Sequence, residues 1–202
     1  MKIHTKDVVI IGGGMVGLSI ANQLIENKIT KNILIIDKEA SLGLHSSGRN
    51  SGVLHSGLYY KPESIKAKVC VAGAKRLRSW VEERGLPLNP CGKVIVPHRE
   101  HLDGELDLLA NRGKSNGAIT ELWDEKQLQD FLPGVRSATG RALWSPNTVV
   151  VNPKIIVNEL KKELEKKGVV FRLYEKHWSL ISQDSLLSLH DGSKIKYGHL
   201  FN

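Results

Sequence analysis

The sequence predicts an α/β fold with a parallel sheet, and three observations near the N-terminus support this. Residues 7–11, DVVII, form a short β-branched run next to glycine, as buried strands do. The GGGMVG that follows opens a segment, Met15 to Asn27, whose apolar residues recur at helical spacing. Residues 33–36 form a second buried run, which stops at Asp37. Because a strand, a helix and a strand follow one another, this βαβ unit implies parallel strands.

The stretch SSGRNSGVLHSGLYY, residues 46–60, is too rich in glycine and serine for a regular helix or strand. A long helix then begins at Pro62 and ends at Gly85. Its apolar residues at helical spacing predict one buried side, made of Ile65, Val69, Ala72, Leu77 and Val81.

The next segments alternate between short strands and helices. The pattern predicts a strand at 93–96, helices at 98–113 and 124–132, two extended pieces within 142–153, and an amphipathic helix over 153–167 with Ile156, Leu160 and Leu164 inward.

The last third of the chain changes to short β-rich runs, several of which we expect to pair antiparallel. The runs are VVFRLY, SLI, SLLSLH and SKIKYG, and Asp191–Gly192 marks a turn between the last two. The final HLFN resembles the start of another buried strand, so we expect the sequence to be cut short there.

Composition limits the function classes. The 202 residues are 41% hydrophobic and 25% charged, which is typical of a globular protein. The apolar runs fall far short of the roughly 20 residues that cross a bilayer, so we expect a soluble protein. An N-terminal secretory signal is disfavoured by Asp7 and the three glycines. The net charge of +8 attracts anions, but no basic-aromatic pattern indicates nucleic acid, and Cys70 and Cys91 lack metal-ligand spacing.

Gly12, Gly14 and Gly17 form G-x-G-x-x-G between the first strand and the first helix, which is the position of a dinucleotide-binding fingerprint. The first glycine permits the turn, the second lets a pyrophosphate approach, and the third lets helix and strand pack closely. Asp37 lies 20 residues beyond Gly17, where a carboxylate can accept hydrogen bonds from a ribose diol. The acid favours NAD or FAD over NADP. The simpler alternative is a tight turn with no ligand.

The long Gly/Ser stretch favours FAD over NAD, because a simple NAD domain would continue with another helix and parallel strand. Short polar side chains and glycines suit a loop laid along an extended cofactor, although a flexible surface loop is the alternative. The polar residues are Ser46, Ser47, Asn50 and Ser51, and the glycines are Gly48, Gly52 and Gly57.

These residues carry a resemblance to a known family. The runs VVIIGGGMVGLSIA, IIDKE, SGRNSGVLHSGLYYKPESIKAKVCVAGA and CGKVIV resemble the FAD-dependent oxidoreductases of the D-amino-acid oxidase type. Within that family the sequence is most similar to members that oxidise L-2-hydroxyglutarate, and the resemblance covers essentially the whole chain. It implies a Rossmann-like FAD-binding domain with an inserted α+β substrate domain, apparently truncated. Residues 1–90, 91–150 and 151–202 would be, in order, cofactor domain, substrate domain, and cofactor domain with an antiparallel meander.

The resemblance also assigns site residues. The fingerprint and Asp37 would bind the ADP half of FAD, and residues 46–55 would pass along the pyrophosphate and flavin. A strand ending near Lys176 would approach the adenine through its backbone. The expected cofactor-binding residues are Gly12, Gly14, Gly17, Asp37, Lys38, Ser46, Ser47, Asn50, Ser51, Gly52 and Lys176.

The expected reaction is oxidation of a 2-hydroxy acid, most specifically L-2-hydroxyglutarate to 2-oxoglutarate, with hydride passing to flavin N5. His55 would take the hydroxyl proton or bind the hydroxyl group, and its alternative is a structural role. Arg49 would pair with a substrate carboxylate or with a cofactor phosphate, and Tyr60 would bind substrate unless it only packs. No metal is expected. A quinone or oxygen would reoxidise the flavin. The alternatives are a flavoenzyme for glycerol 3-phosphate or an amino acid, and a non-catalytic FAD-binding fragment. The expected location is the cytoplasm, or the mitochondrion in a eukaryote, with peripheral contact to the inner membrane left open.

Overall fold

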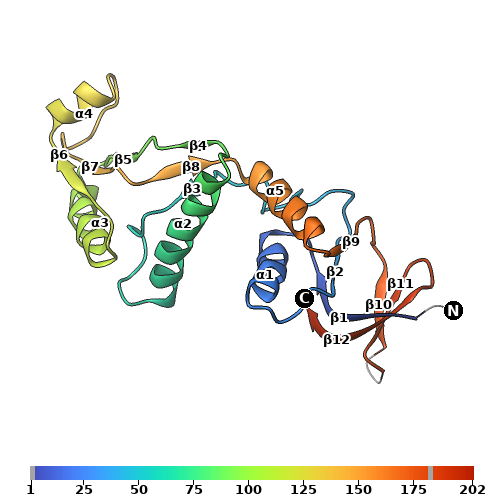
Figure 1. The fold of residues 1–202 in the computed structure, drawn as a ribbon. Coiled ribbons are helices and arrows are strands. Elements are labelled where there is room, and N and C mark those ends of the chain that lie inside the picture. Colours follow the sequence, from blue (N-terminus) through green and yellow to red (C-terminus); the bar gives the residue numbers. More distant parts are fainter. Residues whose placement is uncertain (1–2, 182–183) are drawn as a thin grey trace. The chain divides into compact units, whose positions relative to one another are not determined.

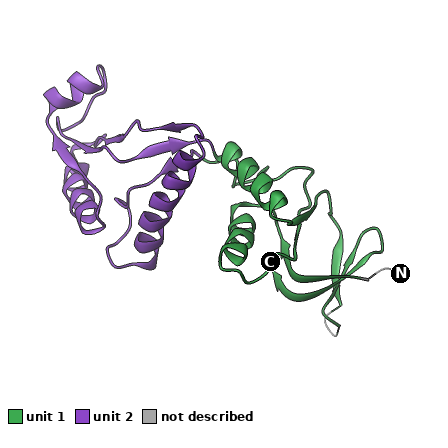
Figure 2. Cartoon of the chain, viewed as in Figure 1, with its two compact units in different colours: residues 1–50, 153–202 green, residues 51–152 purple. Residues whose placement is uncertain are grey.

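The computed structural model describes residues 3–181 and 184–202. The chain divides into two compact units (Figure 2), one made of residues 1–50 and 153–202 and the other of residues 51–152. We call them unit 1 and unit 2. Unit 1 is therefore built from two separate stretches of sequence.

Unit 1 contains a six-stranded sheet in the order β10-β11-β12-β1-β2-β9 (Figure 1). The four strands from β12 to β9 run parallel, whereas β10, β11 and β12 form an antiparallel meander. The prediction of an α/β fold with a parallel sheet is confirmed. The strands are β1 (Ile3–Ile11), β2 (Ile33–Ile36), β9 (Val170–Arg172), β10 (Trp178–Ile181), β11 (Leu186–Leu189) and β12 (Lys194–Phe201).

Both faces of the parallel strands are covered, since all four residues of β2 are buried. Helix α1 (Met15–Glu26) links β1 to β2, and α5 (Pro153–Lys166) precedes β9 and contacts α1. On the other face, meander residues complete an apolar cluster with the central strands. Its buried members are Val9, Leu34, Ile36, Leu187, Leu189 and Ile195. The inward residues predicted for α5, namely Ile156, Leu160 and Leu164, are buried.

The last strand differs from its prediction. Residues 193–198 and 199–202 were expected to belong to separate strands, but β12 runs unbroken from Lys194 to Phe201. It pairs along its length with β1, from Ile3 opposite Lys194 to Ile10 opposite Phe201. This long partner also explains why β1 begins four residues before the predicted run. Gly192, at φ +78°, forms the predicted turn before it.

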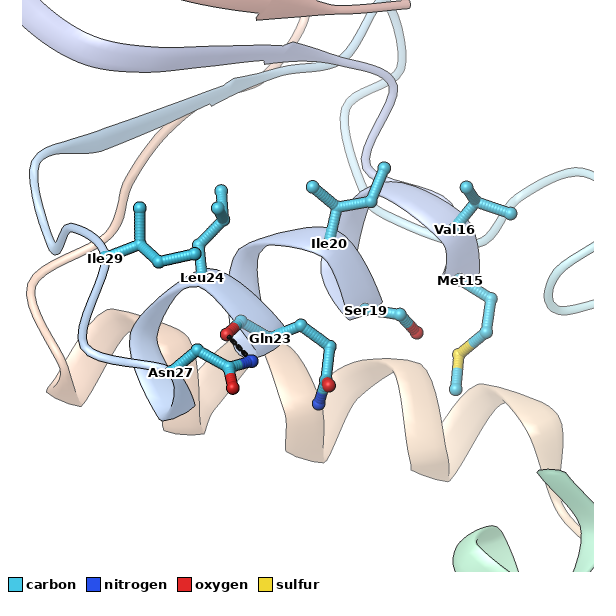
Figure 3. A pocket seen from close by; sticks show the side chains of 8 residues that line it. All are labelled: Met15, Val16, Ser19, Ile20, Gln23, Leu24, Asn27 and Ile29. Atoms are coloured by element: carbon cyan, nitrogen blue, oxygen red, sulfur yellow. Dashed lines mark hydrogen bonds between the residues drawn. The ribbon is translucent and has the colours of Figure 1, made fainter. Parts of the chain in front are cut away.

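One side of α1 is open. Figure 3 shows Val16, Ile20, Leu24 and Ile29 in a row along the helix and the turn that follows it. Together with Met15, Ser19, Gln23 and Asn27 they line a cavity of about 460 Å³, and Val16 is 75% exposed. The apolar spacing that predicted the helix therefore includes a face that unit 1 leaves uncovered.

Unit 2 is an α+β unit with two small sheets. The strands β3 (Val53–Leu54) and β4 (Leu88–Asn89) both pair with β8 (Val149–Val151). The other sheet contains β5 (Lys93–Ile95), β6 (Glu121–Trp123) and β7 (Ala142–Ser145). The helices are α2 (Ile65–Glu83), a 3-10 turn η1 (Glu100–Leu102), α3 (Asp103–Ser115) and α4 (Glu125–Phe131).

Residues 51–89 belong to the same compact unit as residues 91–152, because β3 and β4 pair with β8. The functional division proposed at residue 90 stays a prediction. Along the chain, the boundaries of the compact units lie after residue 50 and before residue 153.

Helix α2 begins later than predicted and buries a different side. Ser64, rather than Pro62, marks its start, because the Ser64 hydroxyl accepts a hydrogen bond from Ala67 N at 3.1 Å. Val81 is buried as expected, but Ile65 is 81% and Val69 64% exposed. Some apolar residues of α2 therefore lie on its exposed side, away from the rest of unit 2.

Candidate functional site

The loop between β1 and α1 and the first turn of α1 each require a glycine. Gly12 has φ +103°, and its N–H donates to the carbonyl of Ile36 at 2.7 Å, which joins the ends of β1 and β2. A Cβ at Gly17 would overlap the carbonyl oxygen of Gly12. The tight turn and the close helix packing expected from the fingerprint are both present in the backbone.

Ser47 lies at the N-terminus of α1. Its hydroxyl accepts a hydrogen bond from the Met15 N–H at 2.9 Å, and a Cβ on Gly14 would lie 3.0 Å from the same oxygen. Gly14 is the extended N-cap residue and supplies no side-chain cap. The first N–H groups of a helix lack intrahelical partners and carry partial positive charge, so they bind phosphate oxygens well. Ser47 therefore places a hydroxyl at the helix N-terminus that the fingerprint predicts to bind a pyrophosphate.

Asp37 connects the glycine loop to the end of β2. Its Oδ2 accepts from Gly13 N at 2.7 Å, and its Oδ1 accepts from Glu39 N at 2.9 Å. A carboxylate offers about four acceptor positions, so two more remain for a ribose diol. The backbone after β9 joins the same edge, because Glu175 N donates to the Asp37 carbonyl at 3.0 Å.

Lys176 directly follows this connection, and its Nζ lies 4.6 Å from the centre of the Tyr174 ring. The N–H of Tyr174 donates to the carbonyl of Glu39 at 2.8 Å. The segment predicted to approach an adenine is thus joined to the end of β2 by backbone hydrogen bonds. Lys38 lies exposed beside Asp37.

The loop after β2 is held by its own hydrogen bonds, which argues against a merely flexible loop. Asn50 Nδ2 donates to the carbonyls of Ser46 and Ser47, at 2.9 and 3.2 Å. His45 Nε2 lies 2.9 Å from Glu39 Oε1, and this contact lowers the pKa of Glu39 below its usual value. The Asn50 amide nitrogen thus faces the loop backbone, and a contact between Asn50 and a cofactor stays a prediction. Arg49 is exposed in the same turn.

His55 lies in unit 2, just after β3. Its ring makes an edge contact with Tyr59 at a centroid distance of 5.7 Å, and Lys93 Nζ lies 4.4 Å from the centre of the Tyr59 ring. Burial, followed by the charge of Lys93, lowers the pKa of His55. The neutral imidazole, which can accept a proton, is therefore favoured at neutral pH. Cys70 Sγ lies 3.6 Å from the His55 carbonyl and joins this segment to α2.

Asn116 was missed in the sequence. From the end of α3 its Nδ2 donates to the carbonyls of Gly57 and Tyr60, at 2.8 and 3.0 Å. It therefore fixes the turn that follows His55. The only signal was an Asn next to Gly117 at a helix end, which predicts a cap and nothing more. Tyr60 itself is half-buried.

The predicted residues fall into both units, as follows. Gly12, Gly14, Gly17, Asp37, Lys38, Ser46, Ser47, Arg49, Asn50 and Lys176 are in unit 1, and Ser51, Gly52, His55 and Tyr60 are in unit 2. Gly52 has φ +68° and is buried, and Ser51 is exposed.

Neither a metal site nor a membrane span is found in the described part of the chain. No group of His, Cys, Asp or Glu residues within 3–181 and 184–202 has the arrangement of a metal site. The same residues contain no helix long and apolar enough to span a bilayer.

The residues of unit 1 fit a dinucleotide. Three backbone segments, at the carboxyl ends of β1, β2 and β9, meet at one edge of the parallel sheet, which is where doubly wound sheets bind nucleotides. A helix N-terminus, a serine hydroxyl and a carboxylate lie there together.

Comparisons with known proteins agree with this geometry. Residues 7–196 match the family described as FAD dependent oxidoreductase. The mitochondrial L-2-hydroxyglutarate dehydrogenase of Caenorhabditis briggsae is 37% identical over 169 residues, which are 83% of this chain and 38% of that enzyme. The chain thus spans well under half of that relative's length.

Two solved structures share the fold. A glycine oxidase from Geobacillus kaustophilus aligns with a TM-score of 0.85 and 18% identity, covering 98% of this chain and 54% of the other. An L-alpha-glycerophosphate oxidase from Mycoplasma pneumoniae with FAD bound aligns with a TM-score of 0.82 and 20% identity, over 98% and 53%.

Proposed function

The chain belongs to the family of FAD-dependent oxidoreductases, and on that premise we propose that it serves the oxidation of L-2-hydroxyglutarate to 2-oxoglutarate. The proposal that the chain binds FAD rests on one observation. The glycine loop, Ser47 and Asp37 lie together at one edge of the sheet. The substrate part is supported by the 37% identity to a relative named for this substrate. Oxidation of another 2-hydroxy acid is the coarser form of the same proposal.

Unit 1 would hold the ADP half of FAD. The α1 N-terminus and the Ser47 hydroxyl would bind the pyrophosphate, and Asp37 would accept hydrogen bonds from the ribose. When bound, the flavin supplies the hydride acceptor. Residues Lys38, Ser46, Asn50, Ser51, Gly52 and Lys176 remain proposed contacts.

His55 would accept the proton of the substrate hydroxyl. Its lowered pKa keeps the imidazole neutral, as a general base requires. Tyr59 packs edge-on against the ring and Asn116 fixes the following turn, so the imidazole is oriented by its own unit. Arg49 and Tyr60 would bind the substrate's carboxylates or line its site. We propose a quinone or oxygen as the electron acceptor.

The test is anaerobic reduction of the FAD-loaded protein, followed by the visible flavin spectrum. L-2-hydroxyglutarate should bleach the flavin, and the D enantiomer should not. Bleaching by glycerol 3-phosphate or by an amino acid, with none by L-2-hydroxyglutarate, would replace the proposed substrate. His55→Gln should keep the bound flavin but slow bleaching by about 10²–10⁴-fold. If this variant binds flavin and bleaches at the wild-type rate, His55 has no part in the mechanism.

A further inference from the structure

A second cavity lies within unit 2 and includes His55 in its lining. Its volume is about 290 Å³, close to the lower end of the roughly 300–1,000 Å³ found for small-molecule sites. Leu54 of β3 and Val149 of β8 supply apolar wall, and helix α2 supplies Lys75 and Arg78. In the described residues that line it there is no Asp or Glu.

One face of α2 supplies the cations. Val71, Ala74, Lys75 and Arg78 all line the cavity and recur at the three- and four-residue spacing of a helix face. Side chains three positions apart have Cβ atoms about 5–6 Å apart, so Lys75 and Arg78 can share one anionic group.

Their existing contacts leave room for such a ligand. Arg78 Nε donates to Glu82 Oε1 at 2.8 Å, which orients the guanidinium and uses one of its five N–H donors. The ion pairs of the described chain do not include Lys75. Glu82 thus balances the charge of Arg78, whereas no ion pair of the described residues balances that of Lys75, and the charge of Lys93 is already felt at His55. An anion in the cavity would balance the charge of Lys75.

We propose that this cavity is a carboxylate subsite in which Lys75 and Arg78 bind the substrate carboxylate farther from the hydroxyl-bearing carbon. The proposal rests on the proposed function for the identity of the ligand, a five-carbon dicarboxylate. It assigns to α2 the selection of dicarboxylates over monocarboxylic hydroxy acids.

The experiment is an NMR titration of the full 202-residue chain with glutarate, which needs neither flavin nor turnover. The readouts are the dissociation constant and the shift of the His55 imidazole signals. Glutarate should bind and move the His55 signals. Lys75→Gln and Arg78→Gln should each weaken glutarate binding by about tenfold or more, because each removes a hydrogen-bond donor to a charged group.

The control is Arg76→Gln, which removes the same charge from an exposed neighbouring position of α2 outside the cavity lining. It should leave the dissociation constant unchanged. Lys75→Arg and Arg78→Lys keep the charge, so they should retain most of the affinity and should still fold if a charge-removing variant does not.

Three results would overturn the subsite: no glutarate binding to the wild-type chain, equal weakening by Arg76→Gln, or wild-type affinity in folded Lys75→Gln and Arg78→Gln. The proposed function fails separately. Glutarate binding that depends on Lys75 and Arg78, without flavin bleaching by L-2-hydroxyglutarate, would keep the subsite and remove the oxidation. If L-2-hydroxyglutarate bleaches the flavin and KM is unchanged in Lys75→Gln and Arg78→Gln, the oxidation stands and the subsite is removed.

Discussion

Replacing Gly17 by alanine tests whether α1 must pack closely on the end of β1. The new Cβ would overlap the carbonyl oxygen of Gly12 and lie 3.1 Å from Cγ2 of Ile10. Because the overlap is with backbone, no side-chain rotation can relieve it. Either the glycine loop or the first turn of α1 must shift.

The expected size follows from two opposing effects. Forcing an extra carbon into a packed site costs about 1–3 kcal/mol, and a backbone overlap belongs at the upper end of that range. Replacing glycine by alanine inside a helix stabilises the helix by about 1 kcal/mol. The net loss should be about 2 kcal/mol, or roughly a 30-fold increase in the unfolding constant of unit 1.

Gly73→Ala is the matched control, because Gly73 also lies inside a helix and a Cβ added there would have no atom within 4 Å outside its own stretch of helix. Here only the helix-propensity gain remains, so unit 2 should be stabilised by about 0.5–1 kcal/mol. Urea unfolding should be followed by resolved NMR signals of each unit, since two units need not unfold in one step. A Gly17→Ala chain as stable as the wild type would refute the packing argument.

Three further outcomes are expected. Ser47→Ala should weaken FAD binding and cost unit 1 about 1 kcal/mol in urea unfolding, because the Met15 N–H loses its partner; unchanged binding would contradict this role. The His55 imidazole should titrate below its ordinary pKa of 6.5 by NMR, so that the acidic limb of any rate profile lies below that pH, and Lys93→Gln should move the titration upward. A His55 titration at or above 6.5 would show that burial does not govern it. Asn116→Ala should increase amide exchange around residues 57–60 without unfolding unit 2, and unaltered exchange would remove its positioning role.

Local patterns were enough to predict the part of the fold that holds the candidate nucleotide site. The buried strand at 33–36, the helix after the glycines and the turn at Gly192 each depend on neighbouring residues, and each is present. The resemblance to FAD-dependent oxidoreductases, read from the same local motifs, is confirmed by the match over residues 7–196.

What the sequence did not predict depends on partners far away in the chain. The continuity of β12 comes from its pairing with β1, and the grouping of β3 and β4 in unit 2 comes from their shared partner β8. The exposed side of α2 was predicted to be buried because periodicity shows that a face is apolar, not what covers it. Asn116, Lys75 and Arg78 carry no motif, so only the three-dimensional arrangement brings them near His55.

The pairing of β1 with β12 also sets an order for biosynthesis. Ile3 lies opposite Lys194, and translation at about 5–20 residues per second would delay β12 by about 10–40 s after β1 leaves the ribosome. Throughout that interval β1 has β2 on one side and an unpaired edge on the other, while residues 51–152 can already be folding as a unit of their own. The nascent chain should therefore bind chaperones through β1 until the ribosome has released Phe201, and arrested chains that end before β12 should be the most prone to aggregate.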